Sequence, residues 1–260
     1  MCNIKAKPRV AAVSFLNSVP LVWGMMQGPQ RSAVDLEFCL PSECADRVRA
    51  GTADVGLLPV VEMARQNLDH SPGIGIACKG PVRSILLFSR GPVQTIRRLA
   101  VDESSRSSVM LARIILRERF GIEPELIVRR PHLASMMAEA DAALMIGDPA
   151  LRVDLATTPY IWLDLGEQWM ELTGLPMVFA VWSGRGIDAD LTKIFRDSWA
   201  YGQKELPALI DHQSDRRGIA RSVVREYLTR YIRFELGENE YEGMRTYLQF
   251  AAELEPAISL

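Results

Sequence analysis

Cysteine is scarce in this sequence. The four that occur, Cys2, Cys39, Cys44 and Cys78, form no C-x-x-C pair and have no histidine near them in the chain. Zinc sites typically take their ligands from such closely spaced pairs. We therefore expect reduced and mostly buried thiols, not metal ligands or disulfides, as suits a cytosolic protein.

Histidine is scarce as well: His70, His132 and His212 are the only three, and each lies in a polar, loop-like stretch. The sequence has no Ser-His-Asp arrangement, no H-E-x-x-H motif and no glycine-rich loop for a nucleotide phosphate. These absences exclude the familiar signatures of serine hydrolases, zinc proteases and nucleotide-binding enzymes. We expect all three histidines at the surface.

Neither an excess of charge nor a long apolar run is present. Lys and Arg total 30 against 32 Asp and Glu, so nothing electrostatic favours a nucleic-acid partner. No apolar stretch approaches the roughly 20 residues that span a bilayer, and no small-residue cleavage site follows the run 10–16. We expect a cytoplasmic protein without a membrane partner, and the sequence assigns no oligomeric state.

Apolar residues are abundant, at 48% of the chain, which is enough for a full-sized core. Short β-rich runs alternate with amphipathic stretches, a pattern typical of mixed or parallel sheets covered by helices. The sequence therefore predicts an α/β protein. The expected strands are 9–13, 34–39, 55–58, 74–77, 85–89, 99–101, 126–128, 142–146, 160–163 and 178–182.

Glycines mark the ends of the two clearest helices. The helix 43–50 stops at Gly51 and the helix 109–120 stops at Gly121, as a C-cap requires. After Trp182 helical periodicity continues without a further strand signal. A helical C-terminal third is therefore predicted, with helices at 189–205, 216–234 and 241–253.

Turn residues interrupt the chain at 89–92 and again at 183–186, each time after a strongly apolar strand. We interpret these breaks as two crossings between lobes. Residues 1–90 and 183–260 then form a discontinuous lobe one, and 91–182 form an inserted lobe two. A small anionic molecule is expected to bind in the cleft between the lobes.

A hydroxyl-rich stretch, 102–108, follows a strand and directly precedes the helix 109–120. Its serines and the free N–H groups of the first helical turn converge there. The helix dipole and these donors favour a well-placed carboxylate by about 0.3 to 2 kcal/mol, which indicates an anion site. N-capping is the alternative, although it needs one hydroxyl and this stretch has four.

Three further loops follow strands or precede them. In 14–21 the Asn17 amide can meet a ligand at the carboxyl end of a strand, and capping of the next helix explains it equally well. Ser84, at the end of 80–84, faces either the cleft or its own turn, and the residues alone favour the turn. For Asp148, after Gly147, they favour a helix cap over a cleft acid.

Taken in order, these loops resemble the chorismate dehydratase family of the futalosine route to menaquinone, which is built on the type II periplasmic-binding-protein fold. The resemblance spans most of residues 9–183, and its segments are specific only jointly. They are 14–21, 41–42, 51–59, 80–84, 105–108, 141–151 and 164–182.

The resemblance implies an α/β fold of two mixed-sheet lobes with a helical C-terminal tail. It also implies that chorismate loses water to give 3-[(1-carboxyvinyl)oxy]benzoate, a reaction that needs no organic cofactor or metal. Asn17 and Ser84, carried over from the family, would orient the substrate carboxylate that takes the proton and the departing oxygen. The implied substrate-binding residues are Ser14, Ser42, Arg106, Ser107, Ser108, Gly147 and Asp148.

Two other functions remain open. A solute-binding protein shares the fold and needs no catalytic group, although we expect no export signal here. The 1,4-dihydroxy-6-naphthoate synthase of the same pathway also shares the fold and relies on a histidine, for which His132 is the candidate in lobe two. The segments 80–84 and 173–176 look like the dehydratase. The family often has threonine at one position of the loop in which Ser108 follows Ser107 here, which leaves open whether Ser107 or Ser108 meets the carboxylate.

Overall fold

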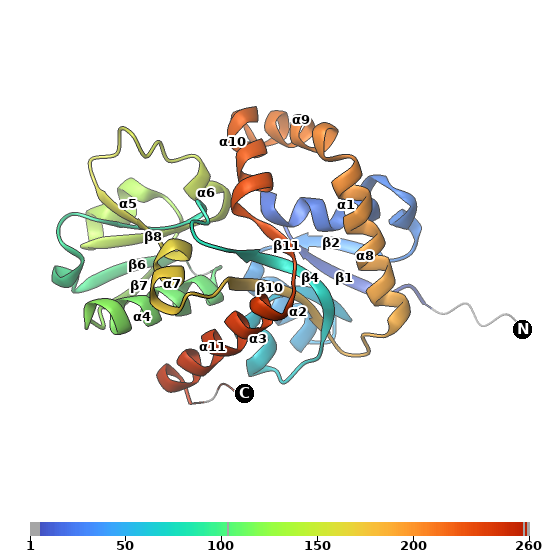
Figure 1. Ribbon diagram of the computed structural model, residues 1–260, viewed down its shortest axis with the longest axis horizontal. Helices are drawn as coiled ribbons and strands as arrows, with labels where there is room; N and C mark the ends of the chain where they lie inside the picture. Colours follow the sequence, from blue (N-terminus) through green and yellow to red (C-terminus); the bar gives the residue numbers. More distant parts are fainter. Residues whose placement is uncertain (1–5, 103, 257, 259–260) are drawn as a thin grey trace, which may run out of the picture.

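The computed structural model describes residues 6–102, 104–256 and 258, which form two lobes, each built on one sheet (Figure 1). The first sheet has the strand order β11-β4-β10-β3-β1-β2 and the second the order β7-β6-β8-β5-β9. Cys2 and Glu103 lie outside the described residues. The two sheets and their helices confirm the predicted two-lobed α/β architecture.

All the predicted strands are present. Those of the first sheet are β1 (Arg9–Val13), β2 (Asp35–Cys39), β3 (Val55–Pro59), β4 (His70–Cys78) and β10 (Met177–Gly184). Those of the second are β5 (Ile85–Ser89), β6 (Arg98–Asp102), β7 (Glu125–Arg129), β8 (Ala142–Ile146) and β9 (Ile161–Asp164). Each sheet contains both parallel and antiparallel neighbours. In the first, β1 is parallel to β2 and β3, and β10 is antiparallel to β3. In the second, β6 is parallel to β7, and β5 is antiparallel to β8.

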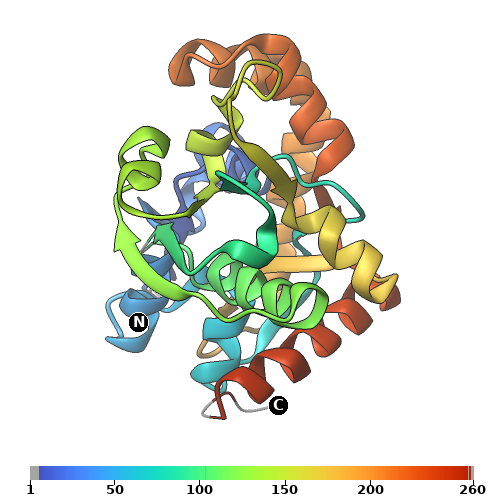
Figure 2. The ribbon, with the colours of Figure 1, turned by 90° about the vertical axis from the view of Figure 1, so that its left-hand side faces the viewer.

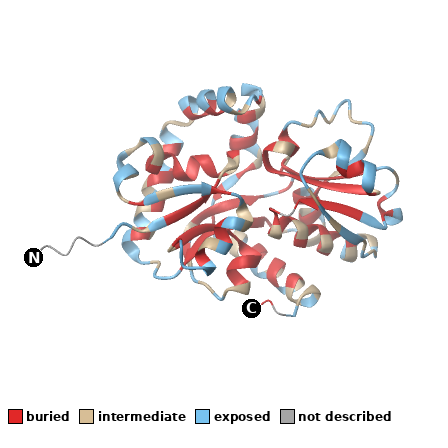
Figure 3. Cartoon of the chain, turned by 180° about the vertical axis from the view of Figure 1, so that it is seen from behind, coloured by how far each residue is buried: buried red, intermediate tan, exposed pale blue. Residues whose placement is uncertain are grey.

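The burial of the strands explains why they could be predicted from the sequence. Every residue of β3, β5, β8 and β10 is buried, and Figure 3 shows these strands as the interior of each lobe. Strands covered on both faces are apolar throughout and do not alternate. The continuous apolar runs of the sequence are therefore the central strands of the sheets.

The helices surround the sheets. They are α1 (Val19–Gln27), α2 (Pro41–Arg49), α3 (Val60–Arg65), α4 (Arg106–Phe120), α5 (Leu133–Glu139), α6 (Gly147–Leu151), α7 (Leu165–Thr173), α8 (Ala189–Lys204), α9 (Leu206–Arg217), α10 (Arg221–Glu226) and α11 (Glu238–Leu254). Gly121 ends α4 in the left-handed conformation, with a φ of 66°, as predicted. Among the described residues no helix combines the length and apolarity needed to cross a membrane.

The predicted single helix 216–234 is wrong. The chain there forms α10, a π-helical turn Tyr227–Tyr231 and a short strand β11 (Arg233–Glu235), which pairs antiparallel with β4. Only Phe234 of this strand is buried, between two exposed charged residues. Three residues are too few to display a strand period, so the local sequence resembled the helices on either side.

The sheet to which each strand belongs shows that both crossings between the lobes lie at other positions than the sequence predicted. β5 belongs to the second sheet and β10 to the first, so the chain crosses within 79–84 and returns within 165–176, not at residues 90 and 182. The turns after Ser89 and Trp182 end strands without separating the sheets. α11 then packs against α3 and β10 of the first lobe and α4 of the second, so the C-terminal tail joins the lobes (Figure 2).

The predicted burial of the cysteines is confirmed within the described part of the chain, where Cys39, Cys44 and Cys78 are buried and have free thiols. Cys39 precedes the residue that caps α2, and Cys44 lies in its first turn, with 2.8 Å between the two sulfur atoms. These are the positions at which apolar side chains pack across a helix start. The pair therefore fixes the angle at which the chain enters α2.

Candidate active site

A cavity with about 550 Å³ of empty space lies between the lobes. Its walls come from both sheets and from the start of α4, and they are largely apolar, with polar groups at a few points. Among the predicted site residues, the structure brings together at this cavity Asn17, Ser84, Arg106, Ser107, Ser108 and Gly147.

Asn17 reaches the cavity from a 3-10 turn, Leu16–Ser18, at the carboxyl end of β1. It is not a helix cap, because no side chain caps α1, and the Ser18 hydroxyl donates back to the Phe15 carbonyl at 2.7 Å. The Asn17 Oδ1 atom is buried and has no hydrogen-bond partner among the described residues. A buried acceptor without a donor costs about 1 to 3 kcal/mol, so this atom is poised for a donor on a ligand.

Ser84 directly precedes β5 and is 1% exposed. Its position is fixed by the preceding residue Arg83, which has a φ of 64°, a conformation rare outside glycine. The Asp164 carboxylate holds that turn by accepting the N–H groups of Val82 at 2.9 Å and Arg83 at 2.6 Å. The segment 80–84 is thus a turn that also aims Ser84 at the cavity, which unites the two readings of the sequence.

The start of α4 contributes hydroxyl and N–H groups to the cavity. The N-cap Ser105 makes no side-chain capping bond, so simple capping does not account for the serines. Ser107 Oγ donates to the Phe179 carbonyl at 3.1 Å, whereas Ser108 Oγ bonds to no other described residue. Ser108 therefore has the freer hydroxyl for an anion.

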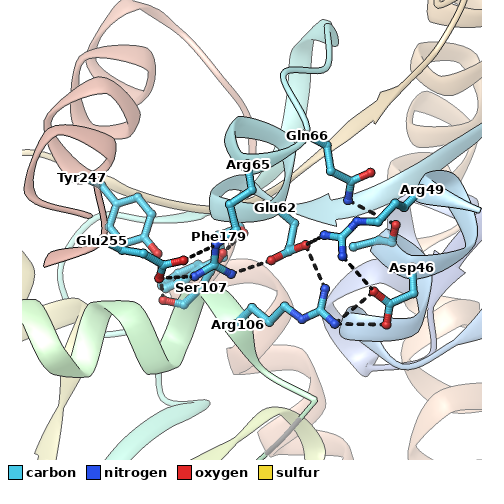
Figure 4. A network of polar contacts seen from close by, with 11 residues as sticks. Asp46, Arg49, Glu62, Arg65, Gln66, Arg106, Ser107, Phe179, Tyr247 and Glu255 are labelled. Carbon is cyan, nitrogen blue, oxygen red and sulfur yellow. Dashed lines mark hydrogen bonds and ion pairs between the residues drawn. The ribbon is translucent and has the colours of Figure 1, made fainter. Parts of the chain in front are cut away.

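Arg106 lines the cavity, but its guanidinium is already engaged. It binds Glu62 at 2.8 Å and Asp46 at 3.0 Å, both in the first lobe (Figure 4). The Glu62 side chain is 2% exposed and also pairs with Arg49 and Arg65. The side chain of Arg106 therefore joins the lobes. Of its groups, the backbone N–H is the one that can make the expected contact with a substrate carboxylate.

Ser14, Ser42 and Asp148 lie beside the cavity and are not among the residues that line it. Asp148 is not the cap of α6. Its carboxylate accepts the Leu16 N–H at 2.9 Å and pairs with Arg217 of α9. Arg217 also donates to the Ser14 carbonyl at 2.9 Å.

The lobes touch at two further points around the cavity. The Ser42 N–H donates to the Ser104 carbonyl at 3.2 Å, which explains why Ser42 lies next to the site without facing it. Gly147 has a φ of 58°, and a Cβ atom there would come within 2.9 Å of the Phe15 ring. Only glycine allows this close approach of the lobes.

Sequence reasoning missed Tyr227. Its hydroxyl donates to Ser84 Oγ at 2.8 Å, and both side chains are buried. Burial raises the pKa of Tyr227 well above its usual value, and the contacts of its hydroxyl with Ser84 and the Asn17 amide offset only part of that rise. A tyrosine within a predicted helix gave no signal of this contact.

The histidines lie away from the cavity. His132 and His212 are exposed, as predicted, whereas His70 is half-buried at the start of β4. His132 bonds to Ser135 at the start of α5 and does not line the cavity. Within the described ranges no cluster of three or more His, Cys, Asp or Glu side chains is arranged to hold a metal ion.

Comparison with known proteins gives both a family and a fold. The sequence matches the profile of a family described as menaquinone biosynthesis over residues 8–253. The chorismate dehydratase of Thermus thermophilus is 26% identical to it over 203 residues, which are 71% of this chain and 74% of that protein.

Solved structures are similar along nearly the whole chain. A protein from Archaeoglobus fulgidus has a TM-score of 0.78 at 15% identity, covering 97% of this chain and 98% of its own. The periplasmic aliphatic sulphonate binding protein of Escherichia coli has a TM-score of 0.68 at 14% identity, covering 96% and 87%. At such identities the likeness concerns the fold alone, and it confirms the predicted periplasmic-binding-protein-like architecture.

Proposed function

The chain belongs to the menaquinone biosynthesis family, and from this membership we propose that it is a chorismate dehydratase, a hydro-lyase that converts chorismate to 3-[(1-carboxyvinyl)oxy]benzoate. The main structural support is the pairing of Asn17 from one lobe with Ser84 from the other at a single cavity. One side chain offers an unpartnered acceptor and the other a hydroxyl.

The cavity suits the substrate chemically. Chorismate carries one carboxylate on its six-carbon ring and a second on the enolpyruvyl ether side chain. The first turn of α4 offers N–H groups and the Ser108 hydroxyl to one carboxylate, with the helix dipole adding to the attraction. Phe15, Ile76 and Ile146 provide apolar contact for the ring.

The reaction removes a hydrogen from the ring carbon that bears the ether and expels the hydroxyl of the neighbouring carbon. The C–H electron pair forms the new ring double bond as the C–O bond breaks and hydroxide departs. In the proposed mechanism the enolpyruvyl carboxylate of the substrate takes the proton and passes it to this hydroxide, so water leaves and the carboxylate is restored. The protein then needs to orient groups and stabilise charge, without supplying a base of its own.

Asn17 and Ser84 fill these roles. The Asn17 Oδ1 atom accepts the hydrogen of the ring hydroxyl, which supplies the donor that this buried atom lacks. The Asn17 N–H donates to the enolpyruvyl carboxylate, and the Ser84 hydroxyl donates to the departing oxygen. Fixed donors in a site shielded from water stabilise developing charge more strongly than water does.

The direct test is turnover. Purified protein mixed with chorismate should deplete the cyclohexadiene absorbance and yield an aromatic product lighter by one water, as seen by mass spectrometry. Dialysis against a chelator should leave the rate unchanged, since neither cofactor nor metal is part of the proposal. The reaction is proposed to take place in the cytoplasm, with chorismate as the partner.

Binding without turnover is the second candidate, because the periplasmic sulphonate-binding protein has the same fold. Chorismate recovered unchanged after saturable binding would favour it. The naphthoate synthase alternative is less well supported, because His132 lies outside the cavity.

A further inference from the structure

We infer that Tyr227 is a positioning residue for the elimination and fixes the Ser84 hydroxyl so that its proton points into the cavity. This inference rests on the proposed function. Tyr227 is not among the residues that line the cavity, so it acts through Ser84 without touching the substrate.

The hydrogen bond between Tyr227 and Ser84 is short and shielded from water. Tyr227 Oη lies 2.8 Å from Ser84 Oγ, and each residue is 1% exposed. Among the described residues Ser84 and the Asn17 amide contact the Tyr227 hydroxyl, and Asp148 and Cys78 lie near enough to act on it electrostatically. Water therefore does not compete for this hydrogen bond.

In the structure the Tyr227 hydroxyl donates to Ser84 Oγ, and the burial of the phenol agrees with this direction. A tyrosine shielded from water keeps its proton, because ionisation would place an unpaired charge in the interior. Tyr227 therefore donates and Ser84 Oγ accepts. A serine hydroxyl has one proton of its own, so the proton of Ser84 remains available to the cavity that Ser84 lines.

This arrangement matters when the C–O bond breaks. The departing oxygen gains negative charge, and a hydroxyl already turned toward it stabilises that charge without reorganisation. A serine without a fixed partner rotates among three staggered positions. Holding Ser84 in one of them raises the rate of the chemical step more than it raises the affinity for chorismate.

The backbone places Tyr227 for this purpose. It is the first residue of the π-helical turn Tyr227–Tyr231, between α10 and β11. Single π-helical turns are rare and often occur at functional sites. The turn lets a residue of the C-terminal tail reach the first residue after the Arg83 turn, 143 positions earlier in the chain.

Tyr227→Phe removes only the hydroxyl and tests the inference. We expect kcat for chorismate to fall about 3- to 10-fold while KM changes by less than about twofold. In a Ser84→Ala background the same substitution should have almost no further effect, because the group that it positions is gone. Tyr241→Phe is the matched control, since the Tyr241 hydroxyl accepts the Gly73 N–H at 2.7 Å outside the cavity.

Several outcomes overturn the inference. These are full activity of Tyr227→Phe, a change confined to KM, or an equal loss with and without Ser84. If Tyr227→Phe does not fold, NMR of tyrosine-labelled wild type decides instead. The Tyr227 hydroxyl proton should give a slowly exchanging signal that shifts in Ser84→Ala, and no such signal refutes the contact. A wild-type protein inactive on chorismate overturns the proposed function as well.

Discussion

The carboxylate of Asp148, in the second lobe, accepts the backbone N–H of Leu16, in the first, at 2.9 Å. Leu16 precedes Asn17, and Gly147, which precedes Asp148, donates its N–H to the Ser84 carbonyl at 2.8 Å. The dipeptide Gly147-Asp148 at the start of α6 therefore holds the backbone beside Asn17 and that of Ser84 in fixed positions relative to each other.

Asp148→Asn should weaken this link. The substitution removes the charge that pairs with Arg217, and the side chains of this pair are only 15% and 9% exposed. We expect a loss of about 1 to 3 kcal/mol in the free energy of unfolding, measured by urea denaturation. Asp211→Asn is the control, because its pair with Arg221 is about half exposed and should contribute less than about 1 kcal/mol. Equal losses of unfolding free energy in the two variants would contradict a stabilising link from Asp148 to Leu16 and Arg217.

Asn17→Ala and Ser84→Ala should each lower kcat/KM for chorismate at least about tenfold, or roughly 1.4 kcal/mol of barrier. His132→Ala should leave it unchanged, because His132 is exposed and lies outside the cavity. Steady-state kinetics on the three purified variants makes the comparison. A large effect at His132 with little at Asn17 would favour the naphthoate synthase instead.

Glu62→Gln should be among the most destabilising conservative changes. The buried carboxylate faces Arg49, Arg65 and Arg106, and removing its charge leaves these guanidinium groups without their shared partner (Figure 4). Breaking a buried ion pair from one side costs about 3 to 5 kcal/mol. Glu37→Gln, at an exposed pair with Arg47, serves as the control, and thermal unfolding of both should separate them clearly.

Alkaline pH should destabilise the fold through two tyrosines. Burial raises the pKa of both Tyr227 and Tyr247 well above their value in the unfolded chain, which is about 10. Below that pH both states are protonated and the stabilisation is complete. Above it the unfolded chain releases protons that the folded chain retains, so stability falls as pH rises.

Urea denaturation between pH 8 and pH 11 measures this effect. Tyr247→Phe should show a shallower decline above about pH 10 than the wild type, since one of the two protons no longer contributes. An identical slope in the two proteins would mean that Tyr247 titrates normally in the folded state. Tyr241→Phe provides a reference that keeps both buried phenols.

The strands and the polar ends of loops could be predicted from the sequence because their signals are local. The buried strand β8 is a continuous apolar run, and Asn17 lies in the loop that follows the apolar strand β1. β11 and Tyr227 could not be predicted, because each depends on a partner far away in the chain. The same holds for Arg106, which the resemblance implied as a substrate-binding residue and whose guanidinium is paired with Glu62, 44 residues away.

The segment 79–84 is at once the path of the chain from one sheet to the other and the carrier of Ser84. A separation of the lobes would bend this segment and carry Ser84 away from Asn17. The two side chains therefore share one cavity only while the two sheets keep the arrangement seen in the structure.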